Sequence, residues 1–247
     1  MSTNIKPYNE AVLAFKEMVA ECKNIVFFGG AGVSTESGIP DFRSVDGLYH
    51  MQYDYPPEKI LSHTFYKRKT KEFYRFYRNK MLFLDALPNQ AHLKLAQLER
   101  DGKLKAVVTQ NIDGLHQAAG SKTVYELHGS VLRNYCEQCG AFHDASFILN
   151  STDVPLCTQC GGPVKPDVVL YEEPLKQNIV DKAVNAIARA EMLIIGGTSL
   201  AVYPAAGLVD YFSGDKLVVI NKSPTPRDSF ADLVIQGAIG EVFSAIE

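Results

Sequence analysis

Four of the five cysteines are spaced as metal ligands often are. Cys136 and Cys139 form one Cys-x-x-Cys pair. After 17 intervening residues, Cys157 and Cys160 form a second. This spacing is typical of a tetrahedral zinc site, and four thiolates would leave no open position, so the metal would be structural. Two disulfides or four free thiols are the alternatives. The fifth, Cys22, lies on the apolar face of a predicted helix, where an inert buried thiol is the simplest interpretation.

A glycine-rich segment follows an apolar run near the N-terminus. Residues 25–28 are apolar, and Gly29, Gly30 and Gly32 come next. Backbone N–H groups in such a loop can bind a pyrophosphate. The dinucleotide fingerprint is incomplete, however, because Thr35 stands at the third glycine position and no clear acid follows about 20 residues on. From these residues alone, a cofactor loop and a tight structural turn both remain open.

The elements that would position these groups alternate between strands and helices. The patterns predict helices over residues 8–22, 63–82, 88–102, 178–190 and 204–212, and strands over 25–28, 104–108, 124–127, 168–171, 192–195 and 217–220. This order indicates an α/β protein with a parallel sheet. Polar and glycine-rich groups follow the strand ends, which is where ligands bind in open α/β sheets. Residues 44–88 and 130–165 fit the sheet poorly and predict a second, smaller lobe built from insertions.

Composition and charge exclude several classes of protein. With 247 residues, 46% apolar residues and 21% charged residues, the chain has the profile of a folded domain. A net charge of −3 lacks the basic footprint of a non-specific nucleic-acid binder. The uncharged stretch 192–209 contains three glycines and a proline, so a strand, a loop and a helix start explain it better than a membrane span. No secretory signal is visible, so we expect a cytoplasmic protein whose reducing surroundings disfavour disulfides.

Several motifs together resemble one family. In order, they are GGAGVSTESGIPDFRS (29–44), TQNIDGLH (109–116), LHG (127–129), the four cysteines, KPDVVLYEE (165–173), GGTSLAVYPA (196–205) and VIN (219–221). Over residues 8–245 the chain resembles the sirtuins, which are NAD-dependent protein lysine deacylases.

The resemblance implies a Rossmann-like domain with helices on both faces of its parallel sheet, formed by residues 1–43, 89–129 and 166–247. A small domain would combine a helical insertion (44–88) with a zinc ribbon (130–165). NAD, as a co-substrate, and an acyl-lysine protein or peptide would meet in the cleft between them. We expect a monomer that contains one structural zinc ion and binds neither nucleic acid nor membrane.

The resemblance also implies which residues contact NAD. Those expected to bind it are Ala31, Gly32, Thr35, Phe42, Arg43, Gln110, Ile112, Asp113, His128, Thr198, Ser199, Asn221 and Ile239. Phe42 and Arg43 would belong to a mobile loop, and Asn221 would bond the adenosine ribose. The blander alternatives are an exposed surface cation for Arg43 and a helix N-cap for Asp113.

Catalysis, on the same resemblance, is assigned to His128, Asn111 and Asp113. The acyl group moves from lysine to ADP-ribose, and nicotinamide is released. His128 would be the general base, since imidazole titrates near neutral pH. Residues 110–113 would bind nicotinamide, with Asp113 bonding its carboxamide, and Phe42 would shield the cationic ribose carbon from water.

The substrate side combines family-like positions with departures. The Val169 carbonyl would bind the acyl-lysine amide, next to Tyr171. Many sirtuins have Phe-Gly-Glu where this chain has Tyr171-Glu172-Glu173, so the local turn is in question. Sirtuins that remove acidic acyl groups resemble one another in a Tyr-x-x-Arg pair, but here Tyr74 is followed by Tyr77, with Arg78 one place off. This favours neutral acyl groups, acetyl first.

Three other activities compete with deacetylation. Protein ADP-ribosylation is the main alternative, because it begins with the same cleavage of NAD. A non-catalytic zinc-ribbon adaptor and a nicotinamide-dependent dehydrogenase are weaker alternatives. The incomplete fingerprint and the missing ribose acid both oppose the dehydrogenase.

Overall fold

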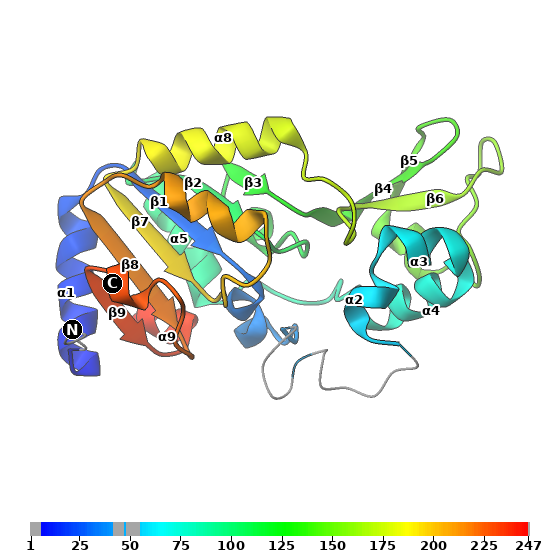
Figure 1. Ribbon diagram of the computed structural model, residues 1–247. Helices are drawn as coiled ribbons and strands as arrows, with labels where there is room; N and C mark the ends of the chain where they lie inside the picture. The colour runs from blue at the N-terminus through cyan, green and yellow to red at the C-terminus, as the bar shows by residue number, and fades with distance from the viewer. Residues whose placement is uncertain (1–5, 42–46, 48–54, 247) are drawn as a thin grey trace.

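Six parallel strands form the main sheet of the molecule (Figure 1). The computed structural model describes residues 6–41, 47 and 55–246. The strand order is β3 (Val124–Glu126), β2 (Leu104–Thr109), β1 (Ile25–Gly29), β7 (Met192–Gly196), β8 (Lys216–Asn221) and β9 (Leu233–Gln236). The central strands β1 and β7 are buried along their whole length, as expected of strands covered on both faces. The predicted α/β architecture is confirmed.

Helices cover both faces of this sheet. On one face lie α1 (Tyr8–Glu21), α5 (Gln90–Arg100), α6 (Leu115–Ala118) and α9 (Ile239–Ser244); on the other lie α8 (Gln177–Ala188) and the 3-10 helix η4 (Ala205–Tyr211). Helix α1 buries Ala11, Val12, Phe15 and Val19, the stripe expected of an amphipathic helix. Two separate apolar clusters result, one on each face.

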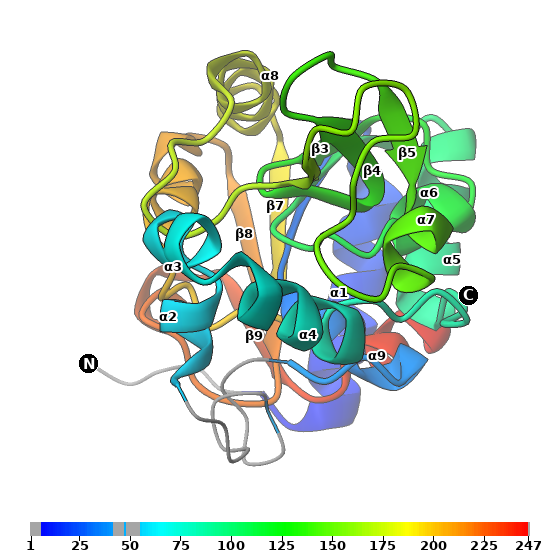
Figure 2. The ribbon, with the colours of Figure 1, turned by 90° about the vertical axis from the view of Figure 1, so that its right-hand side faces the viewer.

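A second sheet lies at the other end of the molecule. It is antiparallel, in the order β5 (Phe142–Asp144), β4 (Gly129–Cys136), β6 (Val164–Val168). Helices α2 (Pro57–Ile60), α3 (His63–Arg68), α4 (Thr70–Lys80) and α7 (Ala145–Leu149) lie beside it (Figure 2). These elements share a third apolar cluster, which is rich in tyrosine and phenylalanine. The aromatic residues of α4 are therefore core residues.

Three predicted elements differ from the structure. The helix expected over 63–82 is broken at Lys69, whose backbone (φ −134°, ψ 49°) is not helical. The strand expected at 168–171 in the parallel sheet is instead β6, which ends at Val168 and pairs antiparallel with β4. The segment expected as a helix over 204–212 is the 3-10 helix η4. Within the residues that the structure describes, no helix has the length and apolar character needed to cross a bilayer.

Candidate functional site

Two glycine loops pack backbone to backbone at the carboxyl edge of the main sheet. The Gly30 N–H donates to the Gly196 carbonyl at 3.2 Å, and the Gly32 N–H donates to the Gly197 carbonyl at 2.8 Å. A Cβ on Gly32 would lie only 2.8 Å from that Gly197 oxygen, so no larger residue fits there. The loop after β1, which holds 3-10 helices η1 (Ala31–Val33) and η2 (Thr35–Ser37), is thus fixed against the loop after β7.

A serine that the sequence analysis did not single out joins the first loop to the segment after β2. The Ser34 hydroxyl donates to Asp113 Oδ2 at 2.7 Å and accepts from Asn111 Nδ2 at 3.1 Å. Asp113 Oδ1 also accepts from the Leu115 N–H at 2.9 Å, but the N-cap of α6 is Gly114, so Asp113 lies one residue before the position that the N-cap alternative requires. Ser34 lies inside the glycine-rich motif, one residue before Thr35, and that position was the available signal.

Gln110 connects β2 to the second glycine loop. Its side-chain amide donates to the Thr198 hydroxyl at 3.0 Å, and that hydroxyl also accepts from the Leu200 N–H at 3.1 Å. Thr198 is buried, whereas Ser199 is exposed. Thr35 donates to the Gly32 carbonyl at 3.0 Å, and Ala31 is half-buried. The structure therefore gathers at one edge most of the residues expected to bind NAD.

His128 lies between β3 and β4, at the same edge. Its Nδ1 is 2.9 Å from the Gln110 carbonyl oxygen. A carbonyl can only accept, so Nδ1 carries the proton and Nε2 keeps a free lone pair. Burial lowers the pKa of His128, against a smaller opposing effect of this hydrogen bond. His128 is thus held as a neutral imidazole with its basic nitrogen available.

The other described histidines are placed for other roles. His116 is buried, and its ring centroid lies 4.7 Å from that of His92. Burial lowers the pKa of His92 to about 4 and holds that of His116 well below its usual value, so both are neutral interior groups. His63 pairs with Glu173, and His143 contacts a cysteine. Among the histidines within residues 6–41 and 55–246, His128 is the one at the strand edge.

The remaining expected NAD contacts lie near the ends of β7 and β8, in the segment after β2, or outside the described residues. Asn221 ends β8, where its side-chain amide donates to the Ser223 carbonyl at 2.7 Å. Ile239 begins α9 and is buried against Gly196. Ile112 is half-buried and packs against the apolar cluster of the smaller sheet. Phe42 and Arg43 lie outside the described residues.

The segment after β6 forms the wall expected to bind the peptide. The Val169 N–H donates to the His128 carbonyl at 2.9 Å, which places Val169 next to the histidine. Tyr171 pairs with the segment before α3: its N–H donates to the Leu61 carbonyl at 3.0 Å, and its carbonyl accepts from the His63 N–H at 2.9 Å. A pocket of about 370 Å³ lies beside this wall and includes Val169 and Glu173 in its lining.

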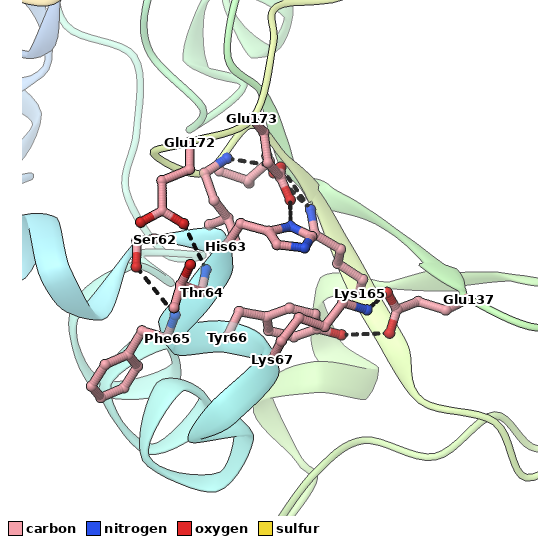
Figure 3. A network of polar contacts seen from close by, with 12 residues as sticks. Ser62, His63, Thr64, Phe65, Tyr66, Lys67, Glu137, Lys165, Glu172 and Glu173 are labelled. Carbon is pink, nitrogen blue, oxygen red and sulfur yellow. Dashed lines mark hydrogen bonds and ion pairs between the residues drawn. The ribbon is translucent and has the colours of Figure 1, made fainter.

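Glu172 occupies the family's glycine position in a left-handed conformation, with φ of 75°. Its carboxylate accepts from the Thr64 N–H at 2.8 Å in the first turn of α3. Glu173 accepts from Lys165 at 3.1 Å and lies 2.8 Å from His63 (Figure 3). The turn that the missing glycine put in question is therefore still made, and the glutamates fasten it to the helical segment.

The four clustered cysteines have the geometry of a tetrahedral thiolate site. Their sulfur atoms all lie within 4.8 Å of one another, with Cys136 and Cys160 at 3.4 Å and Cys139 and Cys157 at 3.6 Å. A disulfide needs about 2.05 Å, whereas four sulfurs about 2.3 Å from a zinc ion would be about 3.8 Å apart. Backbone N–H groups of Cys139 and Gln138 lower the pKa of Cys136 to about 6. This donor set fits zinc.

Comparison with known proteins agrees with this geometry. The model of the Sir2 family matches residues 30–204. A relative from Clostridium acetobutylicum named NAD-dependent protein deacetylase is 61% identical over 234 residues, which are 94% of this chain and 96% of that protein. A solved Sir2 structure with a p53 peptide and NAD+ is 40% identical, with a TM-score of 0.84 over 94% of this chain and 95% of that one. A Sir2 structure with deacetylated p53 peptide and 3'-O-acetyl ADP ribose has a TM-score of 0.88 at 40% identity, covering 95% of this chain and 96% of that one.

Proposed function

The chain belongs to the Sir2 family, and from this we propose that it is an NAD-dependent protein lysine deacetylase. It transfers the acyl group from lysine to ADP-ribose and releases nicotinamide. The observation that best supports this is His128, a neutral imidazole whose Nδ1 is held by Gln110 at the edge where the glycine loops meet. The proposal assigns His128 as the general base that removes a proton from a ribose hydroxyl through Nε2.

The other assigned roles follow from the contacts at this edge. Asn111 and Asp113 position nicotinamide, and their shared contact with Ser34 fixes both side chains relative to the first glycine loop. The two glycine loops offer backbone N–H groups and Thr198 to the phosphates and ribose. Asn221 and Ile239 would hold the adenosine end, and Phe42 and Arg43 belong to the same proposal. Val169 and Tyr171 would bind the acyl-lysine peptide as an added strand.

The acyl group we propose is small and neutral, with acetyl first. Tyr77 is fully buried, and Arg78 donates instead to Ser151 Oγ at 2.9 Å and to the Asp153 carbonyl at 2.8 Å. Arg78 is therefore engaged by the turn at residues 151–153. A carboxylate-bearing acyl group would need a guanidinium directed at it.

We also propose that Cys136, Cys139, Cys157 and Cys160 hold one structural zinc ion. Zinc would fix the two Cys-x-x-Cys turns relative to each other, and with four thiolate ligands it would take no part in the reaction. Thiolate ligands are stable in a reducing compartment, which supports the expected cytoplasmic location.

The expected division into a large domain (1–43, 89–129, 166–247) and a small domain (44–88, 130–165) is part of this proposal. The separate apolar clusters support it. The expected monomeric state belongs to the same proposal.

A panel of acylated peptides with NAD, read by product mass, tests the proposal. We expect nicotinamide and O-acetyl-ADP-ribose from acetyl peptides, and poor turnover of succinyl peptides. His128→Ala should lower kcat by about 10²- to 10⁴-fold, the usual contribution of a general base, and Asp113→Asn should also lose nicotinamide release. Asp101→Asn, an exposed acid at the end of α5, is the matched control. ADP-ribosylated protein in place of O-acetyl-ADP-ribose would instead identify the transferase alternative.

A further inference from the structure

A buried histidine that lies next to the first cysteine pair contacts a sulfur of the second pair. His143 lies on β5, in the hairpin whose β4 strand ends at Cys136, and its Nε2 is 3.4 Å from the Cys157 sulfur. Cys136, Cys139 and His143 belong to the first arm of the ribbon, whereas Cys157 belongs to the second. The contact therefore joins the two arms directly, and it is independent of the mechanism assigned above.

The ring of His143 is held firmly in this orientation. It stacks on Phe147 of α7, with centroids 4.2 Å apart and planes inclined by 30°. Its carbonyl accepts from Asn134 Nδ2 at 3.2 Å, and Asn134 is fully buried on β4. With the backbone bonded and the ring face stacked, the edge that carries Nε2 faces the Cys157 sulfur.

His143 is not itself placed as a ligand. The four cysteine sulfurs form a complete set in which every pair lies within 4.8 Å, and His143 is not part of that set. Four thiolates already fill a tetrahedral zinc site. A metal-bound thiolate has only acceptor capacity, so a ring nitrogen beside it must present its N–H.

Cys157, like Cys136, is a buried member of the cysteine set, so a hydrogen-bond donor to its sulfur is favourable. Cys157 is buried, and it also accepts from the Gln159 N–H at 3.4 Å. Zinc with four thiolates carries two net negative charges, and buried negative charge is costly unless it is hydrogen-bonded. An imidazole that donates through Nε2 offsets part of this charge without adding a ligand.

From these contacts we propose that His143 is a positioning residue for the zinc site. Its Nε2–H bonds the Cys157 thiolate and holds the second Cys-x-x-Cys pair on the metal. This inference rests on the proposed zinc ion and not on the assigned deacetylase chemistry. Loss of the N–H should raise the rate of zinc release while leaving the four sulfur ligands in place.

The test compares His143→Phe and His143→Gln with the zinc-loaded wild type. Phenylalanine keeps a flat ring on Phe147 but has no N–H, whereas glutamine keeps a donor. We expect His143→Phe to release zinc to a chromophoric chelator about 10- to 100-fold faster, the usual effect of losing a partner of a metal ligand, and His143→Gln to recover part of the difference. Phe142→Ala, on the exposed neighbour in β5, is the control and should release zinc at the wild-type rate.

Two further measurements separate the ways in which the inference can fail. Metal analysis of the wild type comes first. Absence of zinc would overturn both the zinc proposal and the role given to His143. Peptide deacetylation reports separately on the proposed activity. X-ray absorption should then show sulfur ligands alone, so a nitrogen ligand would contradict the role given to His143. Thermal unfolding checks that His143→Phe is folded. If the folded variant releases zinc at the wild-type rate, the role given to His143 is also overturned.

Discussion

At the residue scale, one hydrogen bond decides what His128 can do. Because the Gln110 carbonyl can only accept, it selects the tautomer whose Nε2 is unprotonated. A donor at the same place would reverse the tautomer and leave no basic nitrogen for the ribose. The backbone after β2 therefore does two things: it carries Asn111 and Asp113, and it selects the tautomer of His128, the proposed base.

The acid side of the activity profile should report on His128. Burial lowers its pKa below the ordinary value of about 6.5, so the neutral, basic form persists to lower pH than for a free imidazole. Protonation occupies Nε2, so we expect kcat/KM to fall as pH drops through this lowered pKa, with a midpoint below about 6.5. Measurement of kcat/KM for an acetyl peptide between acid and neutral pH checks this. An acid limb centred above that value would contradict the assignment.

Residue types and spacing predict some of these contacts and not others. His128 could be singled out because it precedes a glycine after a strand, and the cysteines because their spacing repeats. Ser34 and Asp113, in contrast, lie 79 residues apart in the chain and meet only through the packing of two loops. The contact of His143 with Cys157 has the same origin, since it depends on how the two arms of the ribbon fold together.

At the element scale, the start of α5 ties the first glycine loop to the body of the protein. Asn89 caps the helix by accepting from the Ala91 N–H at 3.0 Å, and His92 completes a capping box. The amide nitrogen of the same side chain donates to the Val33 carbonyl at 2.7 Å and to Ser37 Oγ at 3.0 Å. One residue thus caps the start of the helix and restrains the loop proposed to bind NAD.

Two substitutions of Asn89 should separate these functions. Asn89→Asp keeps the capping oxygen but loses both donated bonds, so we expect KM for NAD to rise about 5- to 160-fold, because two bonds at a net 0.5–1.5 kcal/mol each amount to about 1–3 kcal/mol. Asn89→Ala should raise KM similarly and also lose about 1 kcal/mol of stability with the cap. Kinetics with NAD varied, together with thermal unfolding, check this. The KM for the peptide should not change. Equal KM values for NAD in wild type and Asn89→Asp would contradict the proposed restraint of the first glycine loop by Asn89.

Element types were more predictable than their pairing. Apolar runs and helical spacing predict the main strands and the first helix, because buried parallel strands and amphipathic helices carry strong local signals. The break at Lys69 has no such signal, since no glycine or proline marks it. The 168–171 segment is apolar enough for a strand of the parallel sheet. The strand that forms there, β6, ends at Val168 and pairs with β4 of the smaller sheet.

At the scale of the molecule, the two sheets pack against different apolar cores. Clusters on both faces stabilise the parallel sheet, whereas the cluster around Tyr66, Phe73 and Tyr74 includes Cys136 and Cys157. Glu137, next to the first cysteine pair, accepts from Tyr66 at 2.9 Å and pairs with Lys67 at 2.6 Å. The cysteine site is therefore continuous with helices α3 and α4.

Removal of the proposed zinc ion should consequently loosen the smaller sheet and its helices and leave the parallel sheet intact. We expect chelation to raise amide hydrogen exchange across residues 129–168 and also across 63–80, because the smaller core loses the link between its two arms. Protection should persist in β1 and β7, whose packing involves neither cysteine pair. Deacetylation should be lost, since His128 directly precedes β4 and Val169 directly follows β6. Cys136→Ala should reproduce the pattern without chelator, and equal loss of protection in both sheets would instead show a single cooperative unit.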